Sequence, residues 1–335
     1  MKALSSLLIL SLTLSVPAWA GPLQKNRIAG DAKWLLHVDL DNLRQTQLGE
    51  FLLTKFLSEH ADGVKTGFHI DPKTVLEKVR SLTAYGSSYD VQRDPQGVLI
   101  IDTDRETQKI LEGIVAAQLL QNPDGPLQQV KNAPFTLYSL NHELFVSPQP
   151  DGMVIAGKSQ EQIERARKVL SGETGNLNSS KAFSGFAQAP DNFFFLGIAE
   201  AFNSLGGLPP QARILQMAQS ARLVLGEKAD KVFLNLVLQG RDSDVNRQIQ
   251  QVIEGMIALV SLGQKDNKDL FDLAQGTKVV SDAKTVTVGI DYPVTNIMAR
   301  LRESDQPRRS KKKKTAAAPA AEKSESSAPA SNQPK

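Results

Sequence analysis

In Gly97-Val-Leu-Ile-Ile-Asp-Thr-Asp-Arg-Glu-Thr-Gln-Lys-Ile-Leu-Glu-Gly-Ile-Val115 the hydrophobic pattern changes its period. The apolar run at the start is typical of a strand, and from Ile110 onward the apolar residues recur at helical spacing. A second stretch repeats this order: a strand pattern at 232–239 leads through a polar turn at 240–244 into a long amphipathic helix. The repetition predicts two related units, each built on a strand that turns directly into a helix.

The order of elements predicts the fold class. Each half reads as strand–helix–strand–strand–helix–strand, which is the order of the ferredoxin-like, or split βαβ, fold. We therefore expect an α+β protein with two related ferredoxin-like units, at residues 21–172 and 191–304. Each unit is expected to have a mainly antiparallel sheet with its helices packed on one face. The polar segment 173–190 is the expected linker.

The N-terminus has the features of an export signal. Lys2 precedes a short apolar core at 7–16, and Ala18-Trp19-Ala20 is a small-x-small cleavage site. The core is well short of the roughly 20 apolar residues that span a bilayer, which disfavours a membrane anchor. We expect residues 1–20 to be a cleaved signal peptide and the protein to be periplasmic or secreted.

Composition excludes several classes of function. The chain has no cysteine, which removes disulfides, thiol catalysis and thiolate metal ligands. Its net charge of +3 is unevenly distributed: without Lys2 and the tail from 307 onward, the body carries −4. An acidic body argues against sequence-specific nucleic-acid binding, for which a basic patch on the folded domain is the usual signature.

The C-terminal segment 305–335 is rich in Lys, Ala, Pro and Ser and is predicted to be disordered. It contains a basic cluster formed by Arg308, Arg309, Lys311, Lys312, Lys313 and Lys314. In an exported protein such a cluster can attract an anionic surface electrostatically. A solubilising tail without a partner is the competing interpretation.

Two aspartate pairs stand where a strand gives way to a helix, Asp102 with Asp104 and Asp242 with Asp244. Paired carboxylates can bind a hard metal cation. Aspartate at this position also caps the exposed N–H groups of a helix, and each copy of the unit needs such a cap. Capping is therefore the favoured interpretation, and a metal site is the alternative.

Local signals on the two predicted long helices complete this pattern. Thr103-x-x-Glu106 has the spacing of a capping box for the first helix. Gly113 and Gly255 lie in the middle of the two helices, where glycine is unfavourable. Their repetition predicts that each helix approaches the sheet or the other half closely, and a functional hinge is the alternative.

A polar row on the opening strand is the main candidate for chemistry. His37 and Asp39 alternate along the strand and Asp41 follows at its exit, opposite the face of Leu36, Val38 and Leu40. We expect this row to face solvent. The alternative is an enzyme, metal-dependent or acid/base, that uses the row at a cleft between the halves.

The opening strand, Ala32-x-Trp34-x-x-His37-x-Asp39, resembles that of a group of uncharacterised exported bacterial proteins. The group carries no assigned activity, so the resemblance implies no catalytic residue. No nucleophilic-serine, nucleotide-binding or zinc-hydrolase motif occurs in a convincing context, and no cofactor is expected. The sequence favours a non-catalytic binding or scaffolding protein of the envelope. Its expected partner is an envelope protein or, through the tail, an anionic surface.

Overall fold

The computed structural model describes residues 23–60, 76–89, 97–181, 183, 192–202, 210–263 and 268–305. The predicted signal peptide, the basic cluster at 308–314 and, within the predicted linker, residues 182 and 184–190 lie outside these ranges, as does the Asp71-Pro72 pair, whose sequence is typical of a helix start.

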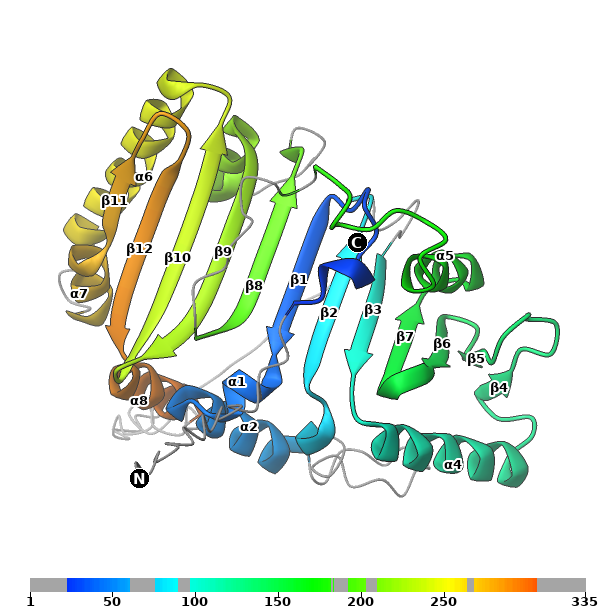
Figure 1. The fold of residues 1–335 in the computed structure, drawn as a ribbon. Coiled ribbons are helices and arrows are strands. Elements are labelled where there is room, and N and C mark those ends of the chain that lie inside the picture. Colours follow the sequence, from blue (N-terminus) through cyan, green and yellow to red (C-terminus); the bar gives the residue numbers. More distant parts are fainter. Residues whose placement is uncertain are drawn as a thin grey trace, which may run out of the picture.

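The described chain forms one antiparallel sheet of 12 strands (Figure 1). The first seven strands are β1 (Trp34–Asp39), β2 (Ser81–Gly86), β3 (Gly97–Asp102), β4 (Leu127–Gln129), β5 (Tyr138–Leu140), β6 (Leu144–Gln149) and β7 (Met153–Gly157). The other five are β8 (Phe193–Glu200), β9 (Ala218–Lys228), β10 (Lys231–Gly240), β11 (Lys278–Ser281) and β12 (Val286–Pro293).

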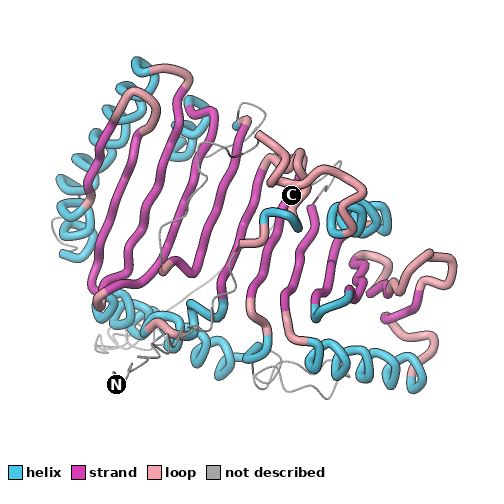
Figure 2. The backbone as a smooth tube through the Cα atoms, in the orientation of Figure 1, coloured by secondary structure: helices cyan, strands magenta, loops and turns pink. Residues whose placement is uncertain are grey.

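The helices lie at the ends and on both faces of this sheet (Figure 2). The α-helices are α1 (Leu40–Arg44), α2 (Gln47–His60), α4 (Arg105–Gln121), α5 (Gln160–Leu170), α6 (Ser243–Gly263), α7 (Lys268–Gly276) and α8 (Val294–Asp305). Three short 3₁₀ helices are η1 (Lys25–Arg27), η2 (Pro150–Gly152) and η5 (Pro210–Met217).

The predicted α+β class is confirmed, but the ferredoxin-like topology is wrong. A split βαβ unit pairs its first and third strands in parallel, whereas β1 pairs antiparallel with β2 and with β8. Successive strands of each half instead form a meander, β1-β2-β3 and β8-β9-β10. The tight turn between β9 and β10 can join only antiparallel neighbours, whereas β1 reaches β2 through a longer connection that contains α1 and α2.

Outward from the β1–β8 pair the two halves have a similar strand order as far as the fifth strand, beyond which the first half adds β5 and β4. One side continues β1-β2-β3-β7-β6 and the other continues β8-β9-β10-β12-β11. In each half a long helix follows the third strand, α4 after β3 and α6 after β10. The halves therefore share one continuous sheet, joined by the antiparallel pairing of their first strands.

Alternation of side chains defines two faces of the sheet. The His37 face carries Leu35, His37 and Asp39 from β1, and the Leu36 face carries Trp34, Leu36 and Val38. Packing on the His37 face involves α5, whose Ile163, Ala166 and Val169 share a core cluster with Leu35 and Ile155. The expectation that helices cover only one face is wrong, because α6 packs on the opposite side.

Helix α6 covers the Leu36 face of the second half. Its Ile249 and Ile253 are 0% and 7% exposed and share a core cluster with Leu238, Val286 and Val288. In Figure 1, α6 lies behind β11 and β12, while η1 lies in front of β1 and β2. Burying each isoleucine side chain is worth about 1.5–3 kcal/mol, so this contact is a main attachment of α6.

The central glycines of the long helices do not mark a close approach. A Cβ atom built on Gly113 or Gly255 meets no heavy atom outside its local surroundings within 4 Å, and both residues are exposed. The expectation of tight helix packing at these positions is therefore wrong. The helices contact their neighbours through other faces.

Candidate functional site

The polar row of the opening strand is buried, contrary to the expectation that it faces solvent. His37 and Asp39 are each 1% exposed, whereas Leu36 on the other face is 45% exposed. The strand register places Thr83 of β2 beside His37, and Ser81 beside Asp39. Polar side chains of neighbouring strands thus extend the row across the His37 face.

Each member of the row has a specific contact. The Nδ1 atom of His37 lies 2.9 Å from the hydroxyl oxygen of Thr83. Asp39 caps α1, since its carboxylate accepts hydrogen bonds of 2.9 Å from the backbone N–H and the side-chain amide of Asn42. Asp41 lies in α1 and forms an ion pair of 2.6 Å with Arg44. Burial raises the pKa of the Asp41 carboxyl group.

Asp102 joins the row from β3, where it pairs with Ser81. Its two carboxylate oxygens bind Arg27 of η1 at 3.1 Å and Arg80 at 2.8 Å. Asp102 is therefore an ion-pair partner, and the expectation that it caps a helix is wrong. Two arginines that are distant from the capping motif hold its carboxylate in place.

The space beside this row is small. A cavity of about 10 Å³ is lined by Gln24, Arg27, Ser81, Thr83, Ile100 and Asp102. That volume is about the minimum needed to hold one water molecule. This cavity has no room for an organic ligand beside Ser81, Thr83 and Asp102.

The aspartates at the starts of α4 and α6 act as predicted caps. Asp104 accepts a hydrogen bond of 2.7 Å from the backbone N–H of Thr107, and Asp242 accepts one of 2.8 Å from Val245. The bond from Thr107 is the main reason why the pKa of Asp104 is lowered. Thr103, expected as the cap, is buried, and its hydroxyl donates to the carbonyl oxygen of Gly152 at 2.8 Å.

This geometry adds no support to the alternative interpretation that the aspartate pairs hold a metal ion. Asp244 is exposed and lies 3.8 Å from Arg247 in the first turn of α6. Asp102 and Asp104 point to different partners, the first to two arginines and the second to a helix N-terminus. Within the described ranges, no three His, Asp or Glu side chains group closely enough to hold a metal ion.

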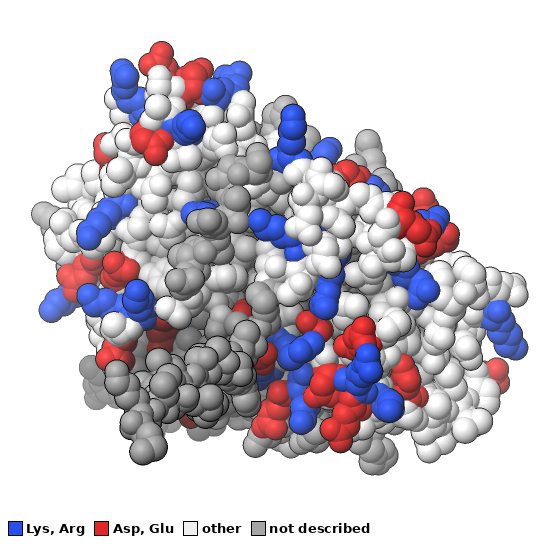
Figure 3. All heavy atoms as spheres, in the orientation of Figure 1, with Lys and Arg blue, Asp and Glu red and all other residues white. Residues whose placement is uncertain are grey.

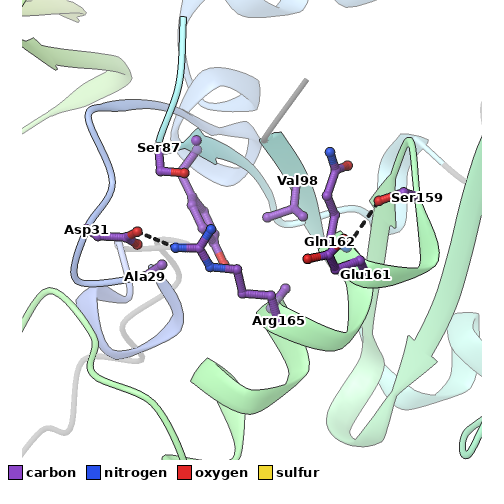
Figure 4. Close-up of a pocket in the computed structure, with 11 residues that line it drawn as sticks. Ala29, Asp31, Ser87, Val98, Ser159, Glu161, Gln162 and Arg165 are labelled. Atoms are coloured by element: carbon purple, nitrogen blue, oxygen red, sulfur yellow. Dashed lines mark hydrogen bonds and ion pairs between the residues drawn. The ribbon is translucent and has the colours of Figure 1, made fainter. Parts of the chain in front are cut away.

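A pocket with a mixed polar and apolar lining lies between α5, the segment before β1 and the neighbouring ends of β2 and β3 (Figure 4). Asp31 forms an ion pair with Arg165 there, and the backbone N–H of Gln162 donates to Ser159 at 3.3 Å. The pocket holds about 80 Å³, room for a few water molecules. Binding sites for organic ligands usually measure about 300–1,000 Å³. This pocket is smaller, but an adjoining hollow, lined among others by Gly30, Arg165 and Asn176, measures about 450 Å³.

Charges on the His37 face are mixed. Figure 3 shows this side of the molecule, where acidic and basic side chains alternate instead of gathering in a block of one sign. The basic cluster at 308–314 lies outside the described residues. No helix in the described part of the chain has the length and hydropathy needed to cross a bilayer.

The Leu36 face is the feature that sequence reasoning missed. On this face, residues that pair between neighbouring strands form rows that run across the sheet. These rows contain only apolar side chains or glycine over many strands. The middle row is Val279, Val288, Leu236, Leu223, Gly197, Leu36, Ala84, Leu99, Ala156 and Val146. The row beside it is Ile290, Leu234, Leu225, Phe195, Val38, Leu82, Ile101, Val154 and Pro148.

This apolar face is unevenly covered. Under α6, Val286 and Leu238 are 0% and 1% exposed. In the first half, Val38, Leu82 and Ile101 on the same face pack against a core cluster that includes Leu40, Leu43 and Leu48 of α1 and α2. Val154 is half-buried, and Leu36 is exposed. The sequence did contain a signal for this surface. In strands such as Leu99-Ile100-Ile101, successive residues are all apolar, so both faces of the strand carry apolar side chains.

Comparisons with known proteins identify no family. No family model and no curated protein matches this sequence. Two crystal forms of TP0453 of Treponema pallidum overlap with the structure at a TM-score of 0.46, with 9% and 10% sequence identity. The overlaps cover 84% and 83% of this chain, and 98% and 95% of TP0453. At this TM-score and identity they establish neither a shared family nor a shared function.

Proposed function

We propose that the protein is an exported, non-catalytic binding protein of the bacterial envelope. Its ligand is the hydrocarbon chain of an amphiphile, held on the Leu36 face where β1 meets β2 and β8. The observation that carries this proposal is the 45% exposure of Leu36 in the middle of a continuous apolar row. The predicted signal peptide and the resemblance of the opening strand to exported proteins support the location.

The exposed apolar surface has an energetic consequence. Fully burying a leucine side chain is worth about 1.5–3 kcal/mol, so covering a half-exposed Leu36 is worth roughly 1 kcal/mol. Half-buried neighbours in the same row, Leu99 and Leu223, add to this gain. A ligand that covers several of these side chains therefore gains several kcal/mol from contact alone.

The chemistry of the rows favours hydrocarbon over peptide. Their side chains carry no hydrogen-bonding group, so a polar atom placed against them would lose its water without gaining a partner. The face of a sheet also offers no free backbone groups to pair with an added strand. Small residues flank Leu36 on the neighbouring strands, Gly197 on β8 and Ala84 on β2.

Trp34 provides a built-in probe for this proposal. It lies on the Leu36 face of β1, and a Cβ atom on Gly97 would be 3.0 Å from its ring. Of the two tryptophans in the chain, Trp19 is in the predicted signal peptide, so Trp34 alone reports on the mature protein. A bound hydrocarbon chain should shift its fluorescence to shorter wavelength.

The test combines this fluorescence with native mass spectrometry of the mature protein purified from cells. We expect a co-purifying amphiphile, saturable binding of a long-chain fatty acid, and about 5–10-fold weaker binding by Leu36→Asn. Val280→Asn is the matched control, because Val280 is 64% exposed on β11 and faces the other side. Unchanged binding by Leu36→Asn, or a co-purifying protein with no amphiphile, would overturn the proposal.

Further assignments belong to the same proposal. Residues 21–172 and 191–304 are proposed as two copies of one unit, linked by 173–190, because both halves have a similar strand order. The basic cluster at 308–314 is proposed to bring the protein to an anionic surface, where amphiphiles are found. The cluster's six positive charges support this assignment.

A further inference from the structure

Two adjoining hollows beside α5 form one depression on the His37 face. The smaller holds about 80 Å³ and the larger about 450 Å³, and Ala29, Asp31 and Arg165 line both. The larger hollow alone is in the range of sites for organic ligands, about 300–1,000 Å³. We call this depression the Arg165 site. Figure 4 shows its smaller compartment, with Arg165 of α5 reaching toward Asp31.

Contacts between distant segments fix the shape of the Arg165 site. The backbone N–H of Gly30 donates to the carbonyl oxygen of Gly175 at 3.0 Å, and that of Leu177 donates to Ile28 at the same distance. A Cβ atom on Gly30 would be 3.1 Å from the carbonyl oxygen of Asn176, so glycine permits this close approach. On the other side, the buried face of α5 belongs to the main core cluster. The site is therefore preformed, as ligand sites usually are.

Tyr85 contributes an unsatisfied polar group to this site. It lines the smaller compartment and pairs with Leu35 of β1, which places its side chain on the His37 face. Tyr85 is 5% exposed, and its buried hydroxyl group forms no hydrogen bond with any described residue. Burial raises the pKa of Tyr85, so the hydroxyl group stays protonated and can donate. Because buried polar groups are nearly always paired, an unpaired one beside a cavity points to a bound partner.

The lining of the site selects the chemistry of the ligand. Asp31 and Arg165 neutralise each other, and Glu161 gives the lining one excess negative charge, which disfavours an anion. The ion pair presents hydrogen-bond acceptors beside donors, and a hydroxyl group suits both because it donates and accepts. Val98 and Ala166 add apolar surface, which the C–H face of a sugar ring can cover and a small ion cannot use.

We propose that the Arg165 site binds a neutral, hydroxyl-rich ligand of the size of one sugar unit. Its hydroxyl groups bind the Asp31–Arg165 pair, and one of them accepts a hydrogen bond from Tyr85. Arg165 gives access to Tyr85, because its side chain is 45% exposed and exposed side chains change rotamer within nanoseconds. Envelope glycans are the source of such units, which rests on the proposed export of the protein. The site lies on the opposite face from Leu36 and is separate from the proposed hydrocarbon site.

Tyr85→Phe tests the proposal through the loss of a single oxygen atom. Because the hydroxyl group has no partner among the described residues, its removal should leave the melting temperature equal or higher. The affinity for a sugar should fall about 3–10-fold, the effect of one hydrogen bond. Tyr292→Phe is the matched control, because its hydroxyl group is also buried without a partner in the described chain and it lines neither compartment.

Arg165→Met tests the ion pair. Methionine keeps part of the aliphatic stem but has no donor, so the affinity for a sugar should fall at least about tenfold. The fold should be little affected, because both partners of the pair are about half exposed. Arg105→Met is the matched control, since it removes the exposed Arg105–Asp151 pair away from the site and should leave sugar binding unchanged.

The measurement is a saturation-transfer NMR titration of the mature protein with N-acetylglucosamine and with glucose, alongside thermal unfolding. We expect saturable binding of at least one of these sugars with a Kd of about 1 mM. Saturable binding of neither sugar, or tighter binding of inorganic phosphate or glycine, would overturn the proposal. Equal sugar affinities of Tyr85→Phe and Tyr292→Phe would also overturn it. Leu36→Asn should leave sugar binding unchanged, which separates a failure here from a failure of hydrocarbon binding.

Discussion

Replacing Ile253 by alanine measures how much of the sheet's stability depends on α6. The side chain is 7% exposed within a core cluster, so its loss removes nearly all of its buried contact. Three carbon atoms at about 0.8 kcal/mol each, together with the cavity left behind, give a destabilisation of about 3 kcal/mol. Ile253→Asp should be worse and cause unfolding or aggregation, because an unpaired charge would be buried.

The assay is urea unfolding followed by circular dichroism and by Trp34 fluorescence. With a slope of about 3 kcal/mol per molar urea, Ile253→Ala should lower the midpoint by about 1 M. Val115→Ala is the control at the corresponding position of α4, and its half-buried side chain predicts a loss below about 1 kcal/mol. Equal shifts for the two variants would refute the idea that α6 is packed and α4 is not.

Three further outcomes are expected. Asp102→Ala leaves Arg27 and Arg80 without their shared carboxylate and should destabilise the fold by about 2 kcal/mol, measured by urea unfolding, because both arginines are partly exposed. The lowered pKa of Asp104 means that its cap stabilises the fold above the ordinary value of 3.8 and loses this effect as the pH falls further. The difference in unfolding free energy between the wild type and Asp104→Asn, whose cap does not titrate, should therefore change below that pH and stay constant above it. Deletion of residues 307–335 should release the protein from the membrane fraction in a salt-sensitive way, and unchanged fractionation would exclude tethering by the tail.

Local sequence signals located many elements correctly. The change of period at Asp102 marks the passage from β3 to α4, and Asp242 caps α6 as expected. Asn141-His142 forms the turn between β5 and β6, and both residues adopt the positive φ that such a turn requires. These features depend on residues close together in the sequence, so a single chain is sufficient to predict them.

Those local signals could not predict which strands, distant in the sequence, pair with each other. The order of helices and strands is compatible with both a split βαβ unit and a meander, and only the pairing of β1 with β2 and β8 distinguishes them. Asp102 illustrates the same limit. Its position suggested a helix cap, but its partners Arg27 and Arg80 become neighbours only after the strands have paired.

The sequence by itself determined that His37 and Asp39 share one face of a strand and that Leu36 lies on the other. It did not determine which face is covered, because a period of two residues is the same for a strand viewed from either side. That choice depends on where η1, α5 and α6 pack. The tertiary structure buries His37 among polar neighbours and leaves Leu36 exposed on an apolar surface. The surface proposed for binding is therefore set by packing between distant segments.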